Sequence, residues 1–142
     1  PLTDPGWGRF LAASGGFDPL HVGHIEYLEK AKKLGDKLVV ILNQDMFLMR
    51  KKGHVFMPFA ERKRILEALK CVDEVVPCID DDQSVCKTLE LLKPAIFAKG
   101  GDRNATNIPE RAVCARLGIK IVDGLGEKVQ SSSELINKIK EK

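Results

Sequence analysis

Five short apolar runs, separated by segments with helical periodicity, restrict the fold of this chain more than any other feature. Continuous apolar runs of this length are typical of strands buried on both faces of a parallel sheet. Their alternation with helical segments of about 10 to 15 residues predicts parallel strands joined by crossover helices. The expected strands are 10–14, 37–43, 73–79, 95–101 and 119–124.

Amphipathic segments and end signals predict five helices between and after these strands. The expected helices are 23–35, 58–72, 84–94, 107–118 and 131–142. The apolar residues expected on the buried faces of the first two are Ile25, Leu28, Ala31 and Leu34, and Ile65, Leu66 and Leu69. The prediction is a single domain over residues 1–142, an α/β Rossmann-like doubly wound fold. It has a five-stranded parallel sheet with helices on both faces.

The composition of the chain limits the classes of partner and ligand that it is expected to bind. A net charge of +3 with mixed signs along the chain speaks against a nucleic-acid-binding face. No apolar run approaches the roughly 20 residues of a membrane-spanning helix, so we expect a cytoplasmic protein without a membrane partner. The four cysteines show no C-x-x-C spacing, which speaks against a zinc site and favours reduced thiols. Nor is the acidic run 80–82 expected to bind metal; we interpret it as a solvated turn.

The segment SGGFDPLHVGH, 14–24, joins the first expected strand to the first expected helix. In a doubly wound sheet this junction borders the ligand crevice. His21 and His24 are three residues apart, so both can face one anion at the N-terminus of the helix. Gly16 and Gly23 carry no side chain and allow close approach of a ligand. A tight turn with two surface histidines is the alternative. The chain has no P-loop and no G-x-G-x-x-G at this junction.

This junction resembles the signature of the cytidylyltransferase-like nucleotidyltransferase superfamily, which has (T/H)-x-G-H at this place. Three further segments are similar to the family in the same order: 58–76 with its proline and E-R, KPAIFAKGGDR at 93–103, and VQSSSELI at 129–136. The resemblance covers 10–136. It implies that a phosphorylated substrate attacks the α-phosphate of a nucleoside triphosphate and releases pyrophosphate, with alignment and charge stabilisation as the protein's contribution.

The resemblance also implies catalytic residues. It assigns His21 and His24 to the phosphates, and Lys52 to the region of the α-phosphate, with Lys51 as a neighbour that could take the same role. Solvated surface lysines are the alternative for both. Arg62, at the E-R position, either binds phosphate or supports the loop, and Glu61 could simply pair with it.

The nucleotide-binding residues implied by the resemblance lie at three junctions. Phe17 and Asp18 belong to the loop that shapes the nucleotide pocket, although Asp18 could equally make an ordinary helix-entry turn. At the fourth strand the residues expected near the sugar and base are Lys99, Gly100, Gly101 and Asp102. The residues expected at the β- and γ-phosphates are Ser131, Ser132 and Ser133.

KGGD and the serine run are most similar to bacterial heptose-phosphate adenylyltransferases of lipopolysaccharide core biosynthesis, which favours ATP and a sugar 1-phosphate. FMN adenylyltransferase and glycerol-3-phosphate cytidylyltransferase are the alternatives, although R-T-E-G-I-S-T, typical of the latter, is missing. A nucleotide-binding module without catalysis is the non-enzyme alternative. The family implies Mg²⁺ on the triphosphate and a homodimer.

Overall fold

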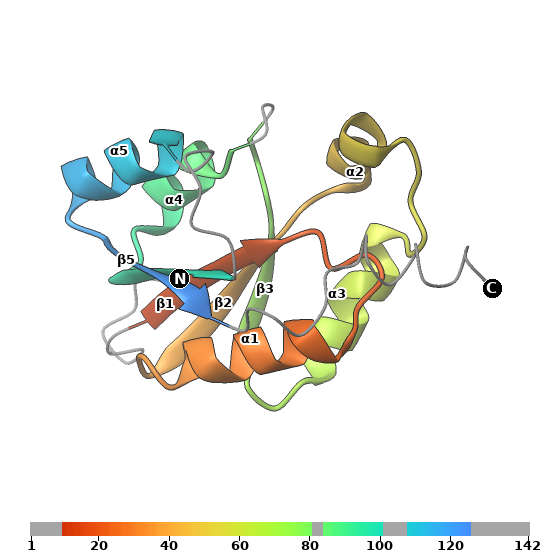
Figure 1. Ribbon diagram of the computed structural model, residues 1–142, viewed down its shortest axis with the longest axis horizontal. Helices are drawn as coiled ribbons and strands as arrows, with labels where there is room; N and C mark the ends of the chain where they lie inside the picture. The colour runs from red at the N-terminus through yellow and green to blue at the C-terminus, as the bar shows by residue number, and fades with distance from the viewer. Residues whose placement is uncertain (1–9, 81–83, 101–107, 126–142) are drawn as a thin grey trace.

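The computed structural model describes residues 10–80, 84–100 and 108–125, and within them five strands and five helices (Figure 1). The strands are β1 Phe10–Gly15, β2 Lys37–Leu42, β3 Glu74–Pro77, β4 Ile96–Gly100 and β5 Lys120–Leu125. The helices are α1 Val22–Lys32, α2 Asp45–Lys52, α3 Phe59–Ala68, α4 Cys86–Leu92 and α5 Ile108–Leu117. All five predicted strands are present, as are the first four predicted helices. The fifth, 131–142, lies outside the described residues.

The strands form one parallel sheet in the order β3-β2-β1-β4-β5. Starting from β1, strands β2 and β3 are added on one side of the sheet, and β4 and β5 are then added on the other side of β1. The strand order therefore reverses between β1 and β4, where ligands bind in doubly wound sheets. This confirms the predicted fold class and places the ends of β1 and β4 beside the expected crevice.

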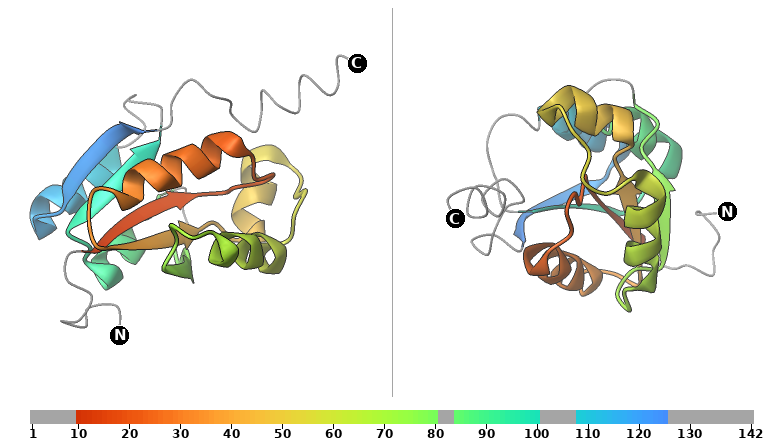
Figure 2. Two further views of the ribbon diagram at one scale, coloured as in Figure 1. Left: turned by 90° about the horizontal axis from the view of Figure 1, so that it is seen from below. Right: turned by 90° about the vertical axis from the view of Figure 1, so that its right-hand side faces the viewer.

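Two apolar layers cover the sheet, because successive strand residues point to opposite faces. In β1, Leu11 and Ala13 pack in the layer that contains α1 and Leu66 of α3. Phe10 and Ala12 pack in the opposite layer, with α4 and Cys114 of α5. Figure 2 shows the helices on the two faces of the sheet. The predicted helices on both faces are therefore confirmed.

Helix α2 was not predicted, and it begins at the carboxyl end of β2, after residues 43 and 44. Its apolar residues are consecutive rather than periodic, and Leu48 is its only buried residue. Met46 and Met49 are exposed. A helix that buries one side chain leaves no amphipathic pattern in the sequence.

Two predicted helix faces also need correction. In α3, Ile65 is 39% exposed, while Arg62 and Leu66 are fully buried. The inward face thus carries a charged residue in place of an apolar one, because its hydrogen-bonding groups find partners inside the protein. In α1, Ile25 is only partly buried, and Tyr27 takes a buried position beside Leu28.

The acidic turn before α4 is not simply solvated. Asp80 is half-buried, and its carboxylate accepts hydrogen bonds from the backbone N–H groups of Lys87 and Thr88 at 2.7 and 3.0 Å. It anchors the first turn of α4, where N–H groups lack helical partners. Asp81 and Asp82 lie outside the described residues. None of the four cysteines, which all lie within the described residues, forms a disulfide. No helix in the described ranges is long and apolar enough to cross a membrane.

Tyr27 connects the two halves of the sheet under the expected crevice. Its hydroxyl donates to the carbonyl of Ala98 in β4 at 2.7 Å and accepts from the backbone N–H of Ser14 in β1 at 3.3 Å. The side chain is buried, and burial raises the pKa of the hydroxyl far above its ordinary value. Tyr27 therefore remains a neutral donor that ties α1 to both strands.

We expect Tyr27→Phe to lower the free energy of unfolding by about 1–3 kcal/mol, because it removes the buried hydrogen bond to the Ala98 carbonyl and the acceptor of the Ser14 N–H. Urea unfolding measures this. The ring and its packing are retained, so the denaturant slope stays unchanged. A cost below a few tenths of a kcal/mol would contradict the assigned bridge.

Candidate active site

The first turn of α1 is capped by two histidines. Nδ1 of His21, the N-cap residue, accepts a hydrogen bond from the Gly23 N–H at 3.1 Å. Nδ1 of His24 reaches back and accepts from the His21 N–H at 3.3 Å. These contacts form a reciprocal capping box, an arrangement that satisfies backbone donors left unpaired at the start of a helix.

This capping box determines where each imidazole carries its proton. A nitrogen that accepts a hydrogen bond has no proton, so the neutral ring of each histidine is protonated at Nε2. The two rings stack with centroids 3.9 Å apart. Nε2 of His21 is buried and has no hydrogen-bond partner within the described residues. The site therefore offers two imidazole N–H donors at the N-terminus of α1. One of them, Nε2–H of His21, is buried and has no acceptor within the described residues.

Both histidines favour the neutral form. Burial, with a smaller electrostatic contribution from His21, lowers the pKa of His24 to about 4. Burial also lowers the pKa of His21. The rings of Phe17 and His24 pack in a T-shaped arrangement with centroids 4.9 Å apart, which contributes to this burial. At neutral pH the pair consequently donates hydrogen bonds without carrying a positive charge.

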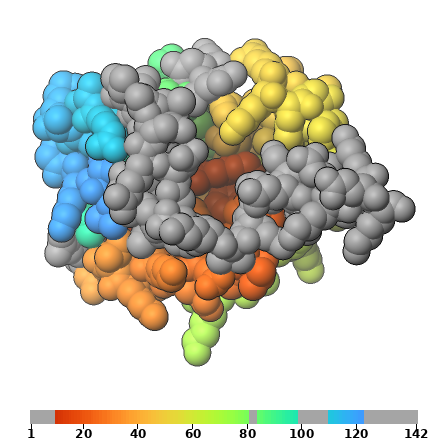
Figure 3. All heavy atoms as spheres, viewed as in Figure 1, coloured from red at the N-terminus to blue at the C-terminus, as the bar shows by residue number. Residues whose placement is uncertain are grey.

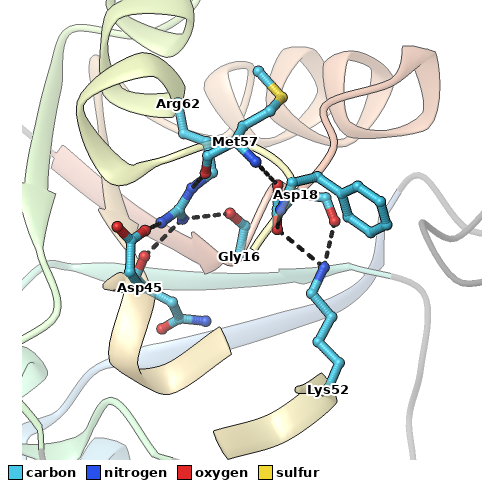
Figure 4. A network of polar contacts seen from close by, with 8 residues as sticks. Gly16, Asp18, Asp45, Lys52, Met57 and Arg62 are labelled. Carbon is cyan, nitrogen blue, oxygen red and sulfur yellow. Dashed lines mark hydrogen bonds and ion pairs between the residues drawn. The ribbon is translucent and has the colours of Figure 1, made fainter. Parts of the chain in front are cut away.

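Residues 16–21, which lead from β1 to the two histidines, are called the histidine loop below. Arg62 connects this loop to three other segments (Figure 4). Its guanidinium donates to the carbonyls of Gly16, Asn43 and Met57 at 2.7–2.8 Å and to the carboxylate of Asp45 at 2.6 Å. The side chain is 0% exposed. Four of its five N–H donors are used within the protein. The two roles expected for Arg62 were phosphate binding and support of the loop, and these contacts correspond to support of the loop. The carboxylate partner is Asp45 rather than the neighbouring Glu61.

Lys52, the last residue of α2, points at the histidine loop (Figure 4). Its ammonium donates to the Asp18 carbonyl at 2.6 Å and lies 3.3 Å from the Asp18 carboxylate. That carboxylate also accepts from the backbone N–H groups of Phe56 and Met57. Asp18 thus has a partner set that the sequence did not predict: it ties the histidine loop to residues 53–57.

The glycines of the junction serve the packing of the site. A Cβ on Gly16 would lie 2.9 Å from Cδ2 of Leu48, so a larger residue here would require the end of the Leu48 side chain to shift. Gly23 is buried in the first turn of α1. Figure 3 shows β1 and the loop after it between α2 and α1.

The remaining predicted residues can be located only in part. Lys99 and Gly100 are the last residues of β4, and their backbone lies at the carboxyl edge of the sheet, where β1 also ends. Gly101 and Asp102 lie outside the described residues, as do Ser131, Ser132 and Ser133. The described part of the site therefore consists of the histidine loop, α2 and the start of α3.

Residues 12–125 match the cytidylyltransferase-like family. The bifunctional protein HldE of Geobacter metallireducens is 39% identical over 138 residues, which cover 92% of this chain and 27% of that protein. HldE of Citrifermentans bemidjiense is 42% identical with the same coverage. This chain thus spans about a quarter of the length of these relatives. The FAD synthase of Ferroglobus placidus is 39% identical over 110 residues, 78% of this chain and 70% of that protein.

Solved structures agree with the fold. A lipopolysaccharide core biosynthesis protein from Thermoplasma volcanium superimposes with a TM-score of 0.69 at 34% identity, covering 82% of this chain and 95% of that one. A protein from Archaeoglobus fulgidus superimposes with a TM-score of 0.65 at 18% identity, covering 89% and 96%. At that identity the second match supports the fold alone.

Proposed function

Because this chain belongs to the cytidylyltransferase-like family of nucleotidyltransferases, we propose that it transfers the AMP part of ATP to a sugar 1-phosphate and releases pyrophosphate. One observation carries the phosphate-binding part of this proposal. Nε2 of His21 is a buried N–H donor without a partner among the described residues. An unpaired buried donor is costly, and a phosphate oxygen at the helix N-terminus would satisfy it.

In the proposed reaction an oxygen of the acceptor phosphate forms a bond to the α-phosphorus, and the bond from that phosphorus to the bridging oxygen of pyrophosphate breaks. The attacking oxygen is already deprotonated at neutral pH, so no general base is needed. His21 and His24 donate through Nε2 to phosphate oxygens, His24 at the α-phosphate. Pre-aligned donors of this kind stabilise charge that develops in the transition state.

The described residues near the histidines are suited to phosphate rather than to a metal ion. They offer imidazole N–H groups and the Lys52 ammonium, and the Asp18 carboxylate already accepts two backbone hydrogen bonds. We therefore expect Mg²⁺ to be held by phosphate oxygens and water, where it would neutralise triphosphate charge. The serines at 131–133 and the 99–102 segment are proposed to hold the phosphates and the nucleoside.

The choice of a sugar phosphate rests on similarity to the HldE proteins over 92% of this chain and on the KGGD segment. The test is pyrophosphate release with ATP or CTP and Mg²⁺ across phosphorylated acceptors: heptose and hexose 1-phosphates, glycerol 3-phosphate, FMN and phosphopantetheine. Release with ATP and a heptose or hexose 1-phosphate is expected. Release only with CTP, or only with another acceptor, would overturn the substrate assignment.

FMN is the second candidate acceptor, because the FAD synthase of Ferroglobus placidus matches over 70% of its own length. The same assay separates the two candidates, since FAD formation changes flavin fluorescence while a sugar phosphate gives no such signal. Two further proposals, that the protein is a homodimer and that it is cytoplasmic, rest on the family resemblance alone. Light scattering measures the molar mass and so tests the homodimer.

The neutral state of His24 predicts a pH dependence of stability. Its pKa is about 4 in the folded chain and 6.5 ordinarily, so the unfolded chain binds more protons between these values. The free energy of unfolding should therefore fall as the pH drops from 6.5 toward 5, by up to about 1.4 kcal/mol per pH unit. Urea unfolding at each pH measures this, and His24→Gln should weaken the dependence. An unchanged slope in that variant would exclude His24 as its source.

A further inference from the structure

The Asp18 carboxylate is engaged away from the helix that follows it. Its side chain is 0% exposed. Oδ2 accepts from the Phe56 N–H at 2.9 Å, and Oδ1 accepts from the Met57 N–H at 2.6 Å. A carboxylate is costly to bury unless it is paired and hydrogen-bonded. Here the partners come from a loop 38 and 39 residues later in the chain, so Asp18 determines where the 53–57 loop lies.

Lys52 is held by the same residue. Its ammonium contacts both the main-chain carbonyl and the carboxylate of Asp18. The side chain is 24% exposed. An ammonium has three N–H donors, and the contacts with Asp18 use two of them. In the part of the chain that the structure describes, Asp18 is its only hydrogen-bond and ion-pair partner, so a third N–H can donate to an oxygen of a bound phosphate.

Asp18 thus connects the two groups that are expected to contact phosphate, the Lys52 ammonium and the pair of histidines. The preceding residue, Phe17, packs on His24, and His21 follows three positions after Asp18. A shift of Asp18 would therefore move Lys52 relative to the histidines. Misplacement of a positioned group by about 1 Å can cost about 10²-fold in rate.

We propose that Asp18 is a positioning residue, which promotes nucleotidyl transfer by holding Lys52 and the 53–57 loop beside the histidine loop. This inference rests on the proposed function. Asp18 does not touch the substrate in this role; it acts through Lys52. Its carboxylate is already occupied by protein donors, so a direct contact with the nucleotide is not required of it.

The test is a double-mutant cycle on pyrophosphate release, with Asp18→Asn, Lys52→Met and the double variant. Asp18→Asn keeps the size of the side chain but turns an NH₂ group toward one of the two backbone donors and removes the charge facing Lys52. We expect kcat to fall about 10- to 50-fold with the KM for ATP changed less than about threefold, because an interaction of the transition state is lost. Lys52→Met should lower kcat by about 10²-fold.

If Asp18 acts through Lys52, the double variant should be no more than about twofold slower than Lys52→Met alone, since coupled residues are not additive. Multiplied effects would overturn the inference, as would wild-type kcat in either single variant. Lys52→Met retains the buried Asp18 carboxylate. If Asp18→Asn does not fold, the kcat of Lys52→Met still tests whether Lys52 acts in the reaction.

Asp73→Asn is the matched control. Like Asp18, Asp73 has a carboxylate that accepts from a lysine, Lys32, and from a backbone N–H, that of Leu38 at 2.8 Å. Leu38 lies at the start of β2, so this contact is at the amino edge of the sheet, away from the histidines. The kcat of Asp73→Asn should stay within about twofold of the parent, as for substitutions away from the site.

A second readout does not depend on activity. Trypsin should cleave Asp18→Asn after Arg50, Lys51 and Lys52 at least about fivefold faster than the parent, because local opening becomes easier when the loop loses its anchor. Equal cleavage rates would overturn the inference even if the protein releases pyrophosphate. If the parent is inactive with every acceptor while the cleavage rates differ, the proposed function fails and the anchoring role of Asp18 stands.

Discussion

His24→Ala is expected to lower kcat for pyrophosphate release by about 10²-fold or more, the usual cost of removing one pre-aligned donor to a transition-state oxygen. The structural reason is that the two nitrogens of the imidazole have different roles. Nδ1 accepts from the His21 N–H, so Nε2 carries the proton of the neutral ring and can donate it to a ligand. Steady-state kinetics with saturating ATP and acceptor measure the loss.

Because His24 also caps α1, His24→Ala should reduce the free energy of unfolding by about 0.5–1 kcal/mol. His24→Gln separates the two roles. Glutamine at this helix position can accept from the N-cap N–H, so its stability should lie within about 0.5 kcal/mol of the parent. Its kcat should still be at least about tenfold lower. A glutamine variant with parental kcat would show that the helix cap, rather than a donor to phosphate, is what His24 supplies.

The sheet and the histidine loop could be predicted because their signals are local. Strands buried on both faces are continuous apolar runs, and their parallel direction follows from the alternation with helices. The place of His21 and His24 at the first turn of α1 follows from the glycines before them and the apolar period after them. None of this needs contacts between distant parts of the chain.

The support beneath the loop could not be predicted in the same way. Arg62 contacts Gly16 and Asn43, 46 and 19 residues earlier, and no local pattern distinguishes a buried arginine from an exposed one. Asp18 likewise reaches residues of the 53–57 loop. The i, i+4 spacing of Gly23, Tyr27 and Ala31 was the available signal for Tyr27, since all three lie on the buried face of α1.

Arg62→Ala is expected to lower the free energy of unfolding by about 3–5 kcal/mol, as when one member of a buried ionic network is removed. The substitution leaves the carbonyls of Gly16, Asn43 and Met57 without the donor they share, and it opens a cavity beneath the loop. Such a loss is a large part of the roughly 5–15 kcal/mol that stabilises a domain. Urea unfolding measures it.

Two further variants identify the cause of this loss. Arg62→Lys keeps the charge, but a single ammonium cannot reach four acceptors that the planar guanidinium serves; a cost of about 2 kcal/mol is expected. Arg64→Ala, two residues along the same helix and exposed, should cost less than about 0.5 kcal/mol. If Arg62 instead served chiefly to bind phosphate, Arg62→Ala would keep near-parental stability and raise the KM for ATP. The burial of its guanidinium and its four internal contacts favour the loss of stability, because a group that stabilises the loop from beneath cannot at the same time extend to a ligand above it.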